Sequence, residues 1–173
     1  PRIAETAIAL WKIYLALTLA EYLALRWAGM NRLDALCHTF ATLGTGGFST
    51  RTASVAAFNS ATIETIIIIF MLLAGMSFVL HYRFWVEWKP RSFFSDIELR
   101  FYLTVVGIAT VAIVSSLMLY NKYALGKALR ESLFQVSSII TTTGFVTSDF
   151  EKWAPLAQFA GYYVALEEGI YRR

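Results

Sequence analysis

Long apolar segments alternate with shorter ones along this chain. The long segments are Ala7–Ala28, Thr62–Tyr82 and Phe101–Tyr120. Each has about the 20 residues that a helix needs to cross a bilayer. The shorter segments, Leu33–Leu43 and Ala128–Ile140, reach only about half of a ~30 Å hydrocarbon core. This pattern predicts an all-α membrane protein in which long helices alternate with re-entrant half-helices.

The order of helix, half-helix, loop and helix occurs twice. We predict a first repeat over residues 1–82, a polar link over 83–100 and a second repeat over 101–173. The second repeat is expected to be incomplete or truncated, because the uncharged run after Pro155 is only Leu156–Leu166. Internal repeats of this kind place a functional site at the interface between the repeats.

The composition favours a membrane protein and excludes several other classes. The chain is 57% apolar and 16% charged, whereas soluble domains are about 45–50% apolar and about 25% charged. A net charge of +3 without a polybasic run gives no support for nucleic-acid binding. No nucleophile–base pair is visible, so the sequence predicts neither an enzyme nor a cofactor. The lipid bilayer is the expected surrounding.

The loops that follow the two half-helices share the pattern Thr-x-Gly-Phe-x-Thr, 97 residues apart. The pattern resembles the Thr-Val-Gly-Tyr-Gly filter loop of potassium channels, whose backbone carbonyls replace the hydration shell of the ion. Glycine permits the torsions that turn successive carbonyls toward an ion. We expect K⁺ at the carbonyls of two filter segments, composed of Thr45, Gly46, Gly47, Phe48, Thr142, Thr143, Gly144 and Phe145.

A turn between helices and a glycine C-cap are the alternative explanation for either loop alone. Two matching loops at matching positions favour a shared pore. In that arrangement Phe48 and Phe145 would wedge their loops against the surrounding helices. Aligning the glycines also places Asp34 on Glu131, each in the first turn of its half-helix, where an acid suits the helix dipole.

Three polar residues inside apolar segments need separate explanations. Lys12 and Glu21 fall on opposite faces of their helix and are not expected to pair; Lys12 would reach an interface and Glu21 would face protein or water. His38 adjoins Cys37, but neighbouring residues on a helix do not converge on one ion, and no further ligands stand at suitable spacing. We therefore expect no transition metal there and a hydrogen-bonded His38 behind the filter.

The chain resembles the Trk/Ktr/HKT superfamily of potassium transporters, and most closely its bacterial Trk type. The resemblance is carried by residues 1–5, 46–50, 74–82 and 142–145. It implies four repeats around a pseudo-fourfold axis, of which this chain is similar to the middle two, with Gly47 and Gly144 as filter glycines. The gate that the family carries after its third filter is not matched by Ala160–Glu168.

The same resemblance implies a multi-pass protein of the bacterial inner membrane, with its filters facing outward and the 83–100 link in the cytoplasm. It also implies a homodimer, a cytoplasmic nucleotide-binding regulatory subunit and potassium uptake, with symport as one mode. The alternative function is a non-conducting membrane scaffold, or a half-transporter fragment that requires other repeats.

Overall fold

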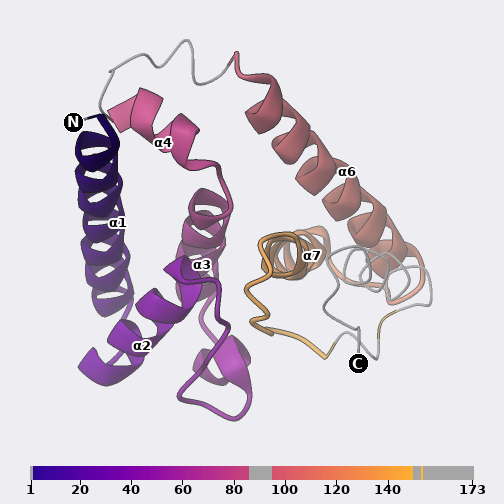
Figure 1. Ribbon diagram of the computed structural model, residues 1–173. Helices are drawn as coiled ribbons and strands as arrows, with labels where there is room; N and C mark the ends of the chain where they lie inside the picture. The colour runs from indigo at the N-terminus through magenta and orange to yellow at the C-terminus, as the bar shows by residue number, and fades with distance from the viewer. Residues whose placement is uncertain (1, 86–94, 150–152, 154–173) are drawn as a thin grey trace, which may run out of the picture.

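The computed structural model describes residues 2–85, 95–149 and 153, and every regular element in these ranges is helical (Figure 1). The α-helices α1 and α6 lie on opposite sides of the arrangement, with α3 and α7 between them (Figure 1). The elements in chain order are α1 (Arg2–Trp27), α2 (Arg32–Leu43), the 3₁₀-helix η1 (Ser54–Phe58), α3 (Ala61–Ala74), α4 (Phe78–Trp85), α6 (Ile97–Leu119) and α7 (Leu125–Ile140).

Two of the described helices are long and apolar enough to cross a membrane. One is the Ala7–Trp27 part of α1, and the other is α6. Their exposed side chains are mainly large and apolar, with Trp11 71% and Phe101 71% exposed. Such faces suit lipid, which is itself apolar, or contact with further protein.

The predicted helix over Thr62–Tyr82 is wrong, because the structure breaks it in two. Helix α3 ends at Ala74, and α4 begins at Phe78 after a three-residue interruption. Gly75 caps α3, with its N–H donating to the carbonyl oxygen of Met71. The 14 residues of α3 extend about 21 Å at 1.5 Å per residue, which is less than the ~30 Å hydrocarbon core.

Side chains from other segments satisfy the carbonyls that the interruption leaves free. His81 Nε2 lies 2.8 Å from the carbonyl oxygen of Leu73, and the Tyr102 hydroxyl donates to that of Leu72 at 3.3 Å. A helix end at membrane depth requires such partners, because no bulk water reaches it. The break cannot be seen in the apolar run of the sequence, because Tyr102, which donates to the freed Leu72 carbonyl, lies 30 residues away along the chain.

Both predicted half-helices are present. Helix α2 starts one residue before the predicted start, and α7 starts three residues before it. Helix α2 is capped by Asn31 as expected, its side chain accepting from the Asp34 N–H at 2.8 Å. Helix α7 begins at Leu125, three residues before the predicted start, and has no side-chain cap. Glu131 therefore lies in the second turn rather than the first, where it faces Lys127 at 3.7 Å.

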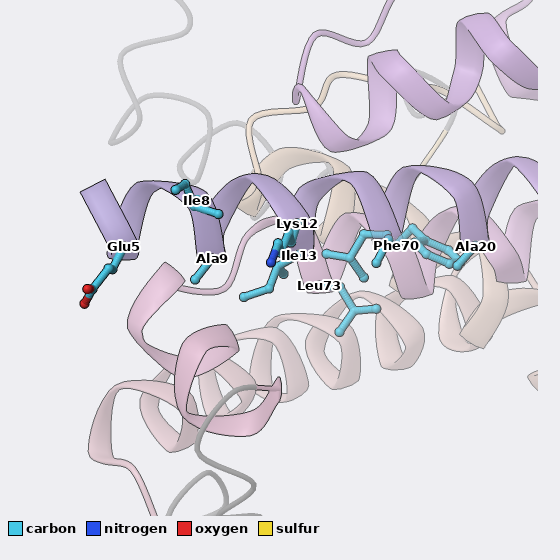
Figure 2. Close-up of a pocket in the computed structure, with 10 residues that line it drawn as sticks. Glu5, Ile8, Ala9, Lys12, Ile13, Ala20, Phe70 and Leu73 are labelled. Atoms are coloured by element: carbon cyan, nitrogen blue, oxygen red, sulfur yellow. The ribbon is translucent and has the colours of Figure 1, made fainter. Parts of the chain in front are cut away.

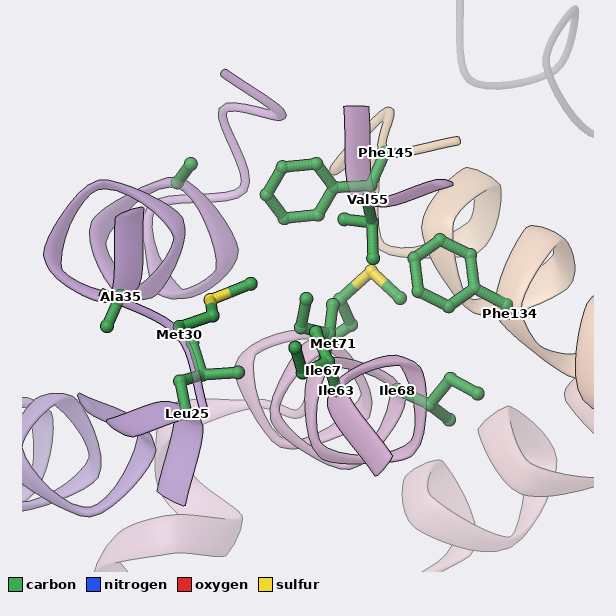
Figure 3. Close-up of a cluster of buried hydrophobic side chains, with 11 residues drawn as sticks. Leu25, Met30, Ala35, Val55, Ile63, Ile67, Ile68, Met71, Phe134 and Phe145 are labelled. Atoms are coloured by element: carbon green, nitrogen blue, oxygen red, sulfur yellow. The ribbon is translucent and has the colours of Figure 1, made fainter. Parts of the chain in front are cut away.

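One apolar core joins both halves of the sequence (Figure 3). Leu25 of α1, Ile67 and Met71 of α3, and Phe134 of α7 are all fully buried in it. Phe145, from the loop after α7, packs into the same cluster (Figure 3). The core therefore holds the loop after α7 against α1 and α3.

The predicted link over 83–100 begins inside α4 and ends inside α6, which starts at Ile97 with Asp96 as its N-cap. The short run Leu156–Leu166 and the unmatched stretch Ala160–Glu168 lie outside the described residues. The division into two repeats stays a prediction.

Candidate ion-binding loops

The loops after α2 and α7 have the same backbone conformation. Thr45 and Thr142 both have positive φ angles, 47° and 57°. Two residues later, Gly47 and Gly144 again have positive φ angles, 63° and 83°. The 97-residue spacing read from the sequence therefore relates two backbones as well as two motifs. Neither loop is helical at its glycine.

Each loop folds back on the end of its own half-helix through equivalent hydrogen bonds. The N–H groups of Gly46 and Gly47 donate to the carbonyl oxygen of Ala41 at 2.8 and 3.4 Å. In the second loop, the N–H groups of residues 143 and 144 donate to the carbonyl oxygen of Ser138 at 2.9 and 3.2 Å. The amide groups of both loops are thus directed toward a helix end.

The carbonyl oxygens of the same loops remain available. Within the described part of the chain, no hydrogen bond is donated to the carbonyls of residues 45–47 or 142–144. Thr143 is buried, while the other five of these residues are exposed or half-buried, so a ligand can reach the loops. A cation can bind to such carbonyls, since a carbonyl dipole binds K⁺ without adding a net charge.

The two loops approach each other at their glycines. A Cβ built on Gly47 would overlap the carbonyl oxygen of Thr143 and would lie 3.2 Å from the carbonyl carbon of Gly144. The corresponding position on Gly144 has no atom within 4 Å. Gly47 therefore lies beside the backbone of Thr143 and Gly144, and the second loop has an open side at Gly144.

Hydrogen bonds to the Asp34 carboxylate hold the C-terminal end of the first loop. The Thr50 hydroxyl donates to Asp34 Oδ1 at 2.5 Å, and Arg51 Nη2 donates to Oδ2 at 2.8 Å. Asn31 Nδ2 donates to the same Oδ2 at 2.7 Å. The Thr50 hydrogen bond and then the Arg51 guanidinium hold the pKa of Asp34 below its ordinary value.

His38 binds the first loop from behind and contacts the second. Its Nδ1 lies 2.7 Å from the carbonyl oxygen of Asp34, so Nδ1 carries the proton. Its Nε2 then accepts from the Ser49 hydroxyl at 3.0 Å. The imidazole ring also stacks on Phe145, with ring centroids 5.5 Å apart. His38 is hydrogen-bonded, as predicted, and it contacts both loops.

The second loop is held by polar contacts of another kind. The buried Ser138 hydroxyl donates to the carbonyl oxygen of Phe145 at 2.7 Å. The Val146 N–H donates to Ser54 Oγ at 3.2 Å, and the Ala56 N–H donates to the Val146 carbonyl at 3.1 Å. Segment η1 thus supports the loop that follows α7.

The two motif phenylalanines have opposite surroundings. Phe145 is fully buried, as predicted. Phe48 is 80% exposed, so its predicted wedge against surrounding helices is wrong for this chain. Phe145 stacks on His38 of α2, and no described helix covers the Phe48 ring in the same way.

Sequence reasoning missed the residues that brace the loops. Arg51 could have been found from the sequence. It directly follows the first motif, and Asp34, its ion-pair partner, stands at the start of the preceding half-helix. Ser138 and Ser54 carried none, because hydroxyl residues are common near helix ends. Glu64 of α3 and Arg130 of α7 form a further ion pair at 2.8 Å that joins these two helices. The described residues contain no group of three or more metal-ligating side chains.

A separate groove of about 690 Å³ lies between α1 and α3 (Figure 2). Its lining is largely apolar, and Lys12 and Glu5 are its charged members. None of the loop residues contributes to it. Lys12 is thus separated from Glu21, which is fully buried, in agreement with the prediction that the two do not pair.

Residues 1–165 match the family model described as TrkH, cation transport protein. The chain is 42% identical over 169 residues to the Trk system potassium uptake protein TrkH of Halomonas elongata, covering 98% of this chain and 35% of that protein. It is 42% identical over 154 residues to TrkH of Escherichia coli K12, covering 88% of this chain and 32% of that protein.

The crystal structure of the potassium transporter TrkH from Vibrio parahaemolyticus superimposes with a TM-score of 0.89 at 36% identity, covering 95% of this chain and 36% of that chain. The chain thus spans about a third of the length of the relatives it matches.

Proposed function

We propose, since this chain belongs to the TrkH family of cation transport proteins, that its two loops form part of a potassium-selective pore in a bacterial inner membrane. The observation that carries the proposal is a pair of loops with matching backbone angles, whose carbonyls accept no hydrogen bond from the described residues. The proposed ligands are carbonyl oxygens of the predicted filter residues at Thr45–Phe48 and Thr142–Phe145. The named potassium uptake proteins among the relatives support K⁺ as the ion.

The carbonyls suit the transport of K⁺ rather than its permanent retention. Several neutral dipoles replace the water that the ion loses, and none of them adds a full charge that would hold it. The hydrogen bonds from loop N–H groups to Ala41 and Ser138 keep the carbonyls on the opposite side of each loop. Transport in this form needs no catalytic residue or cofactor.

Two loops supply only part of a ring of ligands. The open side of Gly144 and the exposed ring of Phe48 are the places where further loops would fit. We therefore propose that conduction requires repeats beyond those in this chain. A homodimer, a cytoplasmic nucleotide-binding subunit and coupling to a second ion belong to this proposal and rest on the family resemblance.

The test is a potassium flux assay in liposomes. We compare the 173-residue chain with a chimera in which it replaces the matched stretch of the Escherichia coli relative. The chimera is expected to carry K⁺, and the chain alone is expected to carry none. Absence of flux in a folded chimera would support the scaffold alternative. K⁺-selective flux through the chain alone would show that two loops suffice and would contradict the incomplete ring.

A further inference from the structure

Glu21 is an acid in the interior of the helix bundle. It lies on α1 with no exposed surface, four residues before the equally buried Leu25 and eight after Ile13, which is 7% exposed. This spacing places all three on one face of the helix. Helix α1 packs through that side against α2, α3 and α4. A further protein segment cannot touch Glu21 without first displacing one of these helices.

Both carboxyl oxygens of Glu21 lack a hydrogen-bond partner among the described residues. The ionisable groups of the surrounding helices are engaged elsewhere: Asp34 with Arg51, His38 with Ser49, Glu64 with Arg130, and His81 with the Leu73 carbonyl. Arg32 is exposed, and neither it nor Cys37 nor Tyr82 forms a described contact with Glu21. Of the other charged groups of α1, Glu5 and Lys12 are exposed, and the half-buried Arg26 donates to the carbonyl oxygen of Met30.

An ionised carboxylate in such a place would be far less stable than the neutral acid. Burying an unpaired charge costs several kcal/mol or more, and a buried carboxylate avoids this cost by binding a proton and becoming neutral. The buried Thr42 hydroxyl of α2 lies close to Glu21, although no hydrogen bond joins the two side chains. It donates its own hydrogen to the His38 carbonyl at 2.8 Å, which leaves its lone pairs free to accept one.

The same threonine connects this acid to the first loop. The carbonyl oxygen of Thr42 accepts from the Thr45 N–H at 3.1 Å, and Thr45 is the residue at which the backbone turns to positive φ. A negative charge on Glu21 would therefore arise directly behind the first filter loop. It would attract a cation bound there and slow its release.

We propose that Glu21 is a proton-binding site: a neutral carboxylic acid behind the first loop that loses its proton in alkaline solution, with a consequent fall in ion flux. The proposed proton site is argued from the burial of Glu21 and from the lack of a described positive charge beside it. The effect on flux rests in addition on the proposed function.

Infrared spectroscopy of the 173-residue chain in lipid tests the proton site without any transport measurement. The difference spectrum between the parent and Glu21→Gln should contain the carbonyl stretch of a protonated carboxyl group at neutral pH. Glu5→Gln, at an exposed position of the same helix, should give only the bands of an ionised carboxylate. A Glu21 difference spectrum with carboxylate bands alone at neutral pH would overturn the proposal. Thermal unfolding of both variants checks that they remain folded.

Flux through the chimera then tests the coupling. Glu21→Gln mimics the neutral acid, so it should keep the neutral-pH flux of the parent and lose the decline at alkaline pH. Equal declines in parent and variant would overturn the coupling to flux. A chimera without flux whose infrared band is present would contradict the proposed function and leave the proton site established.

Discussion

Gly47 contacts the backbone of Thr143 so closely that even a methyl group on Gly47 would overlap the Thr143 carbonyl oxygen. The two residues lie in different loops, after α2 and after α7, yet each belongs to a segment predicted to bind the ion. Backbone cannot move aside as a flexible side chain can. The contact therefore fixes the spacing between two rows of carbonyls, and only glycine permits it.

The two glycines should respond differently to alanine. In Gly144→Ala only the positive φ is unfavourable, and we expect about 1 kcal/mol of destabilisation. In Gly47→Ala the overlap with Thr143 adds roughly 1–3 kcal/mol. Thermal unfolding of the chain in detergent measures both. Gly107→Ala is the control, since that glycine lies in α6 with nothing near its Cβ position and should not be destabilised.

Gly144→Ser should alter ion selection more than folding. The hydroxymethyl group has space, but the residue must still adopt a φ of 83°, which disturbs the direction of the neighbouring carbonyls. We expect lower K⁺ flux or a smaller K⁺/Na⁺ ratio in the chimera. An unchanged ratio, measured with both ions in the same liposomes, would argue against Gly144 as a filter residue.

Neighbouring serines of α7 provide a matched pair for the support of the second loop. Ser138→Ala removes the donor to the Phe145 carbonyl and should cost about 1–2 kcal/mol. Ser137 is equally buried, but its hydroxyl has no described partner, so Ser137→Ala should change stability little. Chemical denaturation in detergent compares them. Equal effects would mean that the Ser138 hydrogen bond does not hold the loop.

The brace on the first loop should depend on pH. Because the Thr50 and Arg51 contacts lower the pKa of folded Asp34, its contribution to stability is complete above the ordinary value of 3.8. The contribution is lost as the pH falls below that value through the lowered pKa. Asp34→Asn should therefore be destabilised by about 1–2 kcal/mol at neutral pH and approach the parent in acid.

The control for Asp34 is Glu5→Gln, which changes an exposed carboxyl group of α1. Its unfolding should follow the parent across the same pH range. If the Asp34→Asn deficit stayed constant down to strongly acidic pH, ionisation of Asp34 would not be the source of the stability.

The sequence predicted the repeated loops well because their determinants are local. Thr45 and Gly47 turn the backbone next to the helix that holds them, and the same residues recur at 142 and 144. The burial of Phe145 and the exposure of Phe48 could not be predicted from that motif, since both residues belong to the same pattern. Phe145 packs into a core shared with residues of α1, α3 and α7, whereas Phe48 lies outside that cluster.

The break after α3 was missed for a related reason. A run of apolar residues is compatible with a continuous helix, and Gly75 alone is weak evidence for an end. The end is stabilised by Tyr102 and His81, whose side chains reach the freed carbonyls from other segments. Tertiary contacts of this kind leave no periodic signal.

The break also provides the last prediction, because it lies against the entrance to the second loop. A Cβ on Gly75 would lie 2.7 Å from Thr141 Cγ2 and 2.8 Å from the Tyr102 hydroxyl. Thr141 is the C-cap of α7, and its hydroxyl pairs with that of Thr143 at 2.8 Å. Gly75→Ala should therefore press on the base of the filter and lower K⁺ flux in the chimera.

Rescue distinguishes this pressure from a general loss of folding. Thr141→Ser removes the crowded methyl group while keeping the hydroxyl that contacts Ser137 and Thr143, and Tyr102→Phe removes the other obstacle. Combined with Gly75→Ala, the two changes should restore most of the flux, because the new methyl group then has room. Each change alone is measured as a control. If the triple variant stayed as impaired as Gly75→Ala while the controls transported normally, the effect would come from the helix ends themselves, and the contact between the break and the second loop would be incidental.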